Sequence, residues 1–255
     1  MTAVKAPAPA TWPITAALLL GLLCACEARA ASPELTRADA LWEQRADGRV
    51  EVQVEGQVEG QAAVRARPEP VRAAIAAYEA VLAAEPENLE ASWKLMRALW
   101  FAADFGAVEA SLERTTYEQA QAVGKRAFAV LAARIGGRAA LEKLSPEDLR
   151  ERMPSELRRD AAELYFWHAL NLGAWSRSAG LLQAVRKGVA GHLHEATLRS
   201  IALDPAVEQG GALRLLSRLH SELPRVPLLS GWVDHEQAVP LARRALAEYP
   251  EHPGN

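Results

Sequence analysis

The sequence has 255 residues, of which 50% are hydrophobic but only 6% aromatic, and its formal net charge is −3. The apolar content is therefore mostly Ala, Leu and Val, and because alanine and leucine have high helix propensities, the composition favours helices over strands. A chain with more acidic than basic residues lacks the excess of positive charge that is usual for nucleic-acid-binding proteins. Nucleic acid is therefore not an expected partner.

The first thirty residues have the pattern of an export signal. Lys5 is the only charge before the apolar run at 14–25, which is too short to span a membrane. Residues 23–26, Leu-Cys-Ala-Cys, resemble the lipobox of bacterial lipoproteins, in which Cys26 would carry the lipid. We predict a lipoprotein signal peptide at 1–25 and a lipidated linker at 26–34. An ordinary signal-peptidase site at 28–30, Ala-Arg-Ala, is the alternative.

This N-terminal pattern predicts an exported protein that faces the periplasm and is anchored by lipid to the bacterial envelope, with the outer membrane favoured over the inner. Both cysteines of the chain lie within the same segment. A chain cut before Cys26 therefore keeps one cysteine, which the lipid consumes, and has no second thiol for a disulfide or a metal site.

The mature chain opens with a predicted helix at 32–47, whose apolar residues Leu35, Ala38 and Trp42 share one face. Residues 50–61, VEVQVEGQVEGQ, then alternate apolar and polar side chains, as a strand or hairpin would. The glycines and the tandem copies of VEGQ at 54–57 and 58–61 instead favour a low-complexity segment. We predict a flexible insertion at 48–70, with a hairpin as the alternative.

Helices that end at a proline recur along the chain. Ala74, Tyr78, Val81 and Pro86 are separated by intervals of 4, 3 and 5, the spacing of the second helix in a tetratricopeptide (TPR) repeat. The same intervals occur twice more, at Leu193, Thr197, Ser200 and Pro205, and at Ala238, Ala242, Ala245 and Pro250. The unequal distances between these prolines imply insertions. The predicted fold is therefore all-α, a TPR-like array of helical hairpins with loop insertions over residues 35–255.

Two of the predicted helices carry a stripe that mixes aromatic and polar residues. In the helix at 89–103 the stripe is Trp93, Arg97, Trp100 and Asp104, and in the strongly apolar helix at 161–175 it is Leu164, His168, Asn171 and Trp175. Such stripes are typical of the concave wall of a helical solenoid. They predict a ligand- or partner-binding surface made by Trp93, Arg97, Trp100, Asp104, His168, Asn171 and Trp175. The alternative is that these side chains fill gaps between helices.

The other elements alternate with turn signals. Gly136 and Gly137 end one helix, and the run Ser145-Pro146-Glu147-Asp148 carries the cap, proline and acidic residues that begin another. Helices are expected at 71–84, 117–133, 179–203, 212–223 and 235–249, and an irregular proline-bracketed loop at 223–232. Asp234, directly before His235, is expected to cap the last of these helices.

The sequence contains no nucleophile elbow, phosphate-binding glycine loop or HExxH metal motif, so an enzyme is not expected. His192 and His194 offer two imidazoles, with His220 or His235 as more distant ligands. On a helix, however, a spacing of two residues points their rings to different sides. We therefore expect no metal and no other cofactor.

The order of these features resembles one family, the T component (TatT) of tripartite ATP-independent periplasmic (TRAP) transporters. The resemblance covers most of the mature chain and is carried by the segments 164–175, 201–205, 210–211, 213–219 and 238–250, together with Leu223, Pro224, Pro227 and Gly231. The chain departs from the family pattern in the VEGQ insertion and in the proline-rich character of the loop 223–232. It implies a TPR-like periplasmic lipoprotein that works with the solute-binding protein (P component) of a TRAP system, as a homo-oligomer such as a trimer with ligand-accessible pores.

The mixed stripes add a hypothesis about the ligand, a small organic acid or a hydrophobic molecule, with Arg97 and His168 placed to meet a carboxylate. A general TPR lipoprotein scaffold for envelope protein complexes is the alternative function, because TPR arrays serve many scaffolding tasks.

Overall fold

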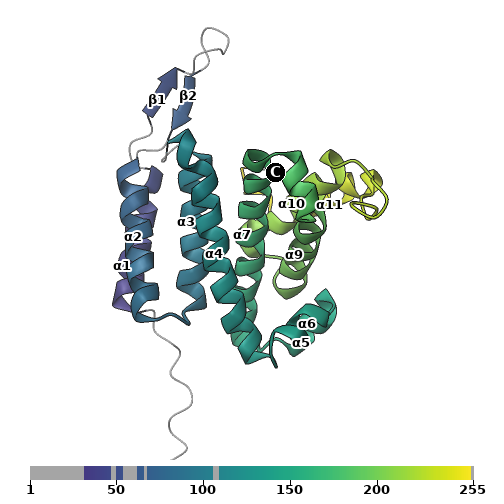
Figure 1. Ribbon diagram of the computed structural model, residues 1–255, viewed down its shortest axis with the longest axis horizontal. Coiled ribbons are helices and arrows are strands. Elements are labelled where there is room, and N and C mark those ends of the chain that lie inside the picture. The colour runs from purple at the N-terminus through teal and green to yellow at the C-terminus, as the bar shows by residue number, and fades with distance from the viewer. Residues whose placement is uncertain (1–31, 47–49, 54–61, 66–67, 106–108, 254–255) are drawn as a thin grey trace, which may run out of the picture. The chain divides into compact units, whose positions relative to one another are not determined.

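Helices dominate the part of the chain that the computed structural model describes, which comprises residues 32–46, 50–53, 62–65, 68–105 and 109–253 (Figure 1). The predicted all-α fold class is confirmed. The α-helices are α1 (Pro33–Glu43), α2 (Pro68–Ala84), α3 (Leu89–Asp104), α4 (Ala110–Arg134), α5 (Arg138–Lys143), α6 (Pro146–Arg152), α7 (Ser155–Ala179), α8 (Leu181–Arg186), α9 (Val189–Leu203), α10 (Gly211–Glu222) and α11 (His235–Glu248). Short 3₁₀ turns cover Gln44–Ala46 and Val207–Gln209.

Several helix starts follow directly from capping residues. The Ser145 side chain accepts a hydrogen bond from the Asp148 backbone N–H at 3.1 Å, with Pro146 in the first turn of α6. Asn88 caps α3 in the same way through the Ala91 N–H at 2.9 Å. Asp234 caps α11 through the Glu236 N–H at 3.0 Å. The predicted starts at Ser145 and Asp234 are therefore confirmed.

Consecutive helices pack on one another as an array. α1 packs on α2, α2 on α3, and α3 on α4. α7 is the central element, since α3, α4 and α9 all pack against it, and Figure 1 shows α4 and α9 on its two sides. The helix expected at 161–175 is the buried middle of α7, which extends beyond it in both directions. Among the described helices, none is both long and apolar enough to cross a membrane.

The segment predicted as a flexible insertion contains paired strands. β1 (Val50–Gln53) and β2 (Ala62–Arg65) form an antiparallel pair, with Val50 opposite Arg65. The prediction of an unstructured loop was therefore wrong for these eight residues, because each strand satisfies the backbone hydrogen bonds of the other. The VEGQ copies at 54–61 lie outside the described residues. The end of the predicted insertion was also wrong, since α2 already begins at Pro68, a residue suited to a first helical turn.

The single helix expected at 179–203 is interrupted. Gly180 has φ 87°, where it ends α7, and Gly188 has φ 60°, where α9 begins. Both values lie in the left-handed region that side chains disfavour, so the two glycines allow the turns that separate α7, α8 and α9. The predicted loop at 223–232 is largely irregular, as expected, and Ser230 holds it together by accepting from the Val226 N–H and donating to the Pro224 carbonyl.

Candidate ligand-binding pocket

Most of the predicted stripe on α7 lies in the closed interior. Leu164 and Asn171 are 0% exposed and Trp175 is 1% exposed. The Asn171 side-chain amide donates to the carbonyls of Met96, at 3.1 Å, and Trp167, at 2.8 Å. The Trp175 indole donates to Glu118 at 3.0 Å. These residues therefore tie helices together, as the gap-filling alternative describes, and do not face an open groove.

The first two residues of the α3 stripe are also engaged in packing. The Trp93 indole N–H donates to Asp160 at 3.0 Å. The Arg97 guanidinium lies 4.4 Å from the centre of the Trp42 ring and 5.1 Å from that of Trp93. Two aromatic rings contact this cation by cation–π interaction, while its Nε atom is buried without a hydrogen-bond partner among the described residues.

The remaining α3 residues lie near the other end of that helix. Trp100 packs against Phe105 and Trp167, with ring centres 5.8 and 5.7 Å apart. The Asp104 carboxylate pairs with Arg177 at 3.0 Å and accepts from the Tyr117 hydroxyl at 3.4 Å. Asp104 borders a polar hollow of about 310 Å³, but its carboxylate is already matched by the Arg177 cation.

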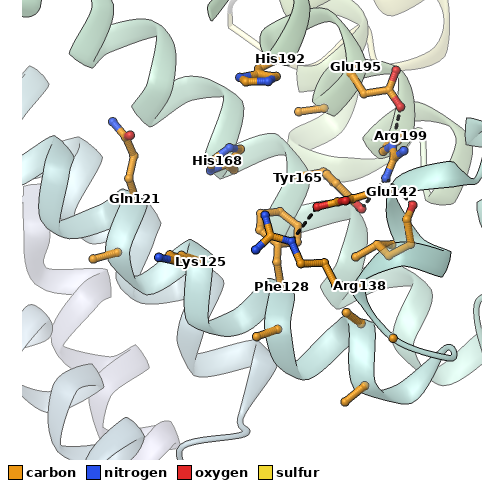
Figure 2. Close-up of a pocket in the computed structure, with 17 residues that line it drawn as sticks. Gln121, Lys125, Phe128, Arg138, Glu142, Tyr165, His168, His192, Glu195 and Arg199 are labelled. Carbon is orange, nitrogen blue, oxygen red and sulfur yellow. Dashed lines mark hydrogen bonds and ion pairs between the residues drawn. The ribbon is translucent and has the colours of Figure 1, made fainter. Parts of the chain in front are cut away.

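His168 is the one predicted site residue that lines a larger pocket. This pocket has a volume of about 820 Å³ and lies between α4, α5, α7 and α9 (Figure 2). Its size falls within the roughly 300–1,000 Å³ that is typical of small-molecule sites. The lining consists of Gln121, Ala122, Lys125, Phe128, Ala129, Ala132 and Ala133 from α4, Gly137, Arg138, Leu141 and Glu142 around α5, Tyr165 and His168 from α7, and His192, Glu195, Ala196 and Arg199 from α9.

The hollow exists because the residues of α4 that face it are small. Ala122, Ala129 and Ala133 follow at helical spacing, so they share one side of the helix. Because a methyl group fills little of the space between packed helices, the gap stays open there. Gly136 and Gly137, with φ 101° and 100°, then turn the chain so that α5 reaches the pocket.

Two buried polar atoms of the pocket have no hydrogen-bond partner among the described residues, His168 Nδ1 and Gln121 Nε2. The His168 ring packs edge-on against Phe128, with ring centres 5.3 Å apart. Burial, with a smaller effect from His192, lowers the pKa of His168 to about 4, so its imidazole is neutral at neutral pH. Both atoms are fully covered by neighbouring atoms, so neither is exposed to the pocket space in this arrangement.

Arg199 forms the framework of the pocket. Its guanidinium donates to the carbonyls of Leu141 and Leu144 and to the Tyr165 hydroxyl, at 3.0–3.1 Å. It also pairs with Glu195 at 2.6 Å. These bonds fasten the end of α5 to α7 and α9. The guanidinium of Arg199 therefore has little donor capacity left for a ligand.

The other two cations of the lining differ in their partners. Arg138 pairs with Glu142 at 2.6 Å, and the dashed line in Figure 2 marks this contact. Lys125 on α4 has neither an ion pair nor a hydrogen bond among the described residues, and its side chain is exposed. Lys125 is therefore the cation of the pocket that is available to a ligand.

Of the pocket residues, the sequence analysis selected only His168 for ligand binding, and it considered His192 only as a metal ligand. The prediction relied on stripes of aromatic and polar residues along single helices. The hollow instead depends on small residues on α4, the helix that lies opposite α7. The signal was present in α4, where Lys125 lies on the same face as Ala122, Ala129 and Ala133.

The two histidines considered for a metal lie in different surroundings. His192 lines the pocket, whereas His194 stacks on Trp232 with ring centres 3.9 Å apart, so the expectation that their rings diverge is confirmed. Within the described residues, no group of three or more metal-ligating side chains is assembled. Comparison of the chain with models of protein families and with curated protein sequences gives no match.

Proposed function

We propose that this protein is a lipid-anchored periplasmic accessory subunit of a TRAP-type transporter. In this role it docks on the solute-binding protein and holds a small organic or hydrophobic ligand. The support from the sequence is the lipobox-like segment ending at Cys26 together with the order of segments that resembles TatT proteins. The support from the structure is an array of helices with an open pocket of ligand size between α4, α5, α7 and α9.

The pocket between α4, α5, α7 and α9 is the observation that carries the ligand-holding part of this proposal. It combines a mostly apolar lining with a few polar and charged groups, which is the usual make-up of small-molecule sites. Among these groups, Lys125 has neither an ion pair nor a hydrogen bond within the described residues.

A general envelope scaffold is the second candidate. Burial of Trp93, Asn171 and Trp175 favours it, because a ligand wall made of these residues would have to be open. The two candidates share export and lipid attachment, and they differ in their partners.

Affinity purification of the full-length protein from its native envelope separates the two candidates. Recovery of a solute-binding protein in stoichiometric amount is the result expected for the TRAP role. Recovery of outer-membrane assembly factors without a solute-binding protein would overturn that role in favour of a scaffold.

Lipid attachment has its own test. Cys26→Ser is expected to move the protein from the membrane fraction to the soluble periplasmic fraction, because it removes the only thiol of the mature chain. Cys24→Ser, two residues earlier, is the matched control and should leave fractionation unchanged. Membrane association that persists in Cys26→Ser would contradict the lipid anchor.

A further inference from the structure

The charges around the pocket restrict the kind of ligand it can hold. The lining contains three permanent cations, Lys125, Arg138 and Arg199, and two carboxylates, Glu142 and Glu195. Arg199 pairs with Glu195 and Arg138 with Glu142, each at 2.6 Å. With His168 neutral, one positive charge remains, on Lys125. A single unmatched cation at a site favours a ligand with one negative charge.

The shape and polarity of the lining add a second requirement. Phe128, Leu141 and five alanines make most of the wall apolar. The Phe128 and Tyr165 rings lie 4.8 Å apart, so they form a continuous aromatic surface. A small, fully hydrated dianion would leave this surface uncovered, whereas an apolar chain or ring would cover it and leave the water.

We infer that the pocket binds an amphipathic monocarboxylate, with its apolar body against Phe128 and the α4 alanines and its carboxylate at Lys125. This inference rests on the ligand-holding part of the proposed function, and it does not depend on which protein partner is recovered.

Three eight-carbon compounds and succinate test the ligand class on the purified full-length protein by isothermal titration calorimetry. Octanoate carries the charge and the apolar body, 1-octanol lacks the charge, octylamine reverses it, and succinate has two charges and almost no apolar body. Octanoate is expected to bind at least about tenfold more tightly than each of the others, because a charge-assisted hydrogen bond adds to burial of the chain. Equal or tighter binding of succinate or octylamine would overturn the inference.

Two lysine variants locate the charge. Lys125→Met is expected to weaken octanoate about tenfold and to leave 1-octanol unchanged, because only the carboxylate loses its partner. Lys143→Met is the matched control, since Lys143 is also exposed, lies at the end of α5 and is not part of the lining. Octanoate affinity that is the same in Lys125→Met and the wild type would contradict the assigned position of the carboxylate.

A filled pocket provides a test that does not depend on charge. Ala129 is exposed on the hollow, so Ala129→Phe can occupy the space without displacing a packed neighbour. This variant should keep its far-ultraviolet circular dichroism and lose binding of both octanoate and 1-octanol. Binding that survives in a folded Ala129→Phe would place the ligand elsewhere. Failure of these ligand tests while a solute-binding protein is still recovered from the envelope would overturn the ligand class and leave the transporter role standing.

Discussion

The two faces of α7 have similar residues and different surroundings. Toward α3, Trp167 packs on Trp100, and Asn171 donates to the Met96 carbonyl. Toward α4 and α9, Tyr165 and His168 border the pocket of about 820 Å³. Each face therefore presents aromatic and polar groups, but only the second has space in front of it. We call the side of α7 toward α3 the closed face and the side that borders the pocket the open face.

The difference comes from the helices that face α7. α3 contributes large side chains such as Trp93, Met96 and Trp100, which fill the space between the two helices. At the pocket, α4 contributes Ala129, Ala132 and Ala133, and these small side chains leave the space between α4 and α7 unfilled. An aromatic and polar stripe is therefore insufficient to identify a binding surface, because the size of the opposing residues decides whether it is open.

The largest expected loss of stability comes from removing a large side chain from the closed face. Trp167 is 5% exposed, and its indole donates to Glu163 at 3.1 Å. Trp167→Ala should lower the free energy of unfolding by about 3–5 kcal/mol in urea denaturation, because it leaves a cavity and an unpaired carboxylate oxygen. Ala122→Gly, at an exposed position of the pocket lining, is the comparison variant and should cost about 1 kcal/mol, the helix propensity difference alone. Equal losses in the two variants would mean that the closed and open faces do not differ in packing.

The closed face also contains a carboxylate whose ionisation opposes folding. Glu163 is 1% exposed, and burial raises its pKa from 4.5 to about 7, despite its ion pair with Arg159 at 2.7 Å. The folded state thus binds the proton more tightly than the unfolded state does. The stabilisation is present at pH values below 4.5 and is lost as the pH rises to about 7, with a maximum of about 3 kcal/mol from this difference in pKa.

Glu163→Gln removes this titration and keeps an oxygen that accepts from Trp167. The free energy of unfolding of the wild type, minus that of the variant, should be larger at pH 5 than at pH 8 by up to about 3 kcal/mol. Glu142→Gln, an exposed carboxylate at the pocket, should change stability by less than about 1 kcal/mol at either pH. A difference for Glu163→Gln that grows with pH would show that Arg159 outweighs burial.

The sequence predicts the fold better than the site, because the two depend on different information. Helix starts at Ser145 and Asp234 depend on a few adjacent residues, and the predictions there were right. The breaks at Gly180 and Gly188 were missed because a helix tolerates an isolated glycine unless the chain must turn. The hairpin was given too little weight because its second strand, Ala62–Arg65, has little alternation of its own and is recognised only by its pairing.

The site depends on which helices lie opposite one another, and a single sequence does not contain that information. His168 was selected because it shares a stripe with Trp175, yet the pocket joins it to Lys125 and Arg199, which are on other helices. Likewise, the sequence pattern around neither residue shows that Glu163 on α7 is buried while Asp104 on α3 is partly open to water. Periodicity identifies a face of a helix, and only the packed structure shows what covers that face.

A smaller pH effect, of opposite sign, is expected on the open face. The pKa of His168 is lowered from 6.5 to about 4 by burial, so the folded state binds this proton more weakly than the unfolded state does. The stability that the neutral ring contributes is fully present above pH 6.5 and is lost as the pH falls toward 4. Because the ring borders a pocket that water can enter, the loss should be about 1–2 kcal/mol rather than the full value of the shift. His168→Phe keeps a flat ring against Phe128 and removes the titration, so the wild type should lose stability relative to this variant between pH 7 and 4.5 in urea denaturation. A relative gain over that interval would mean that the imidazolium is stabilised in the pocket, and the open face would then resemble the closed face in favouring the protonated form of its titrating group.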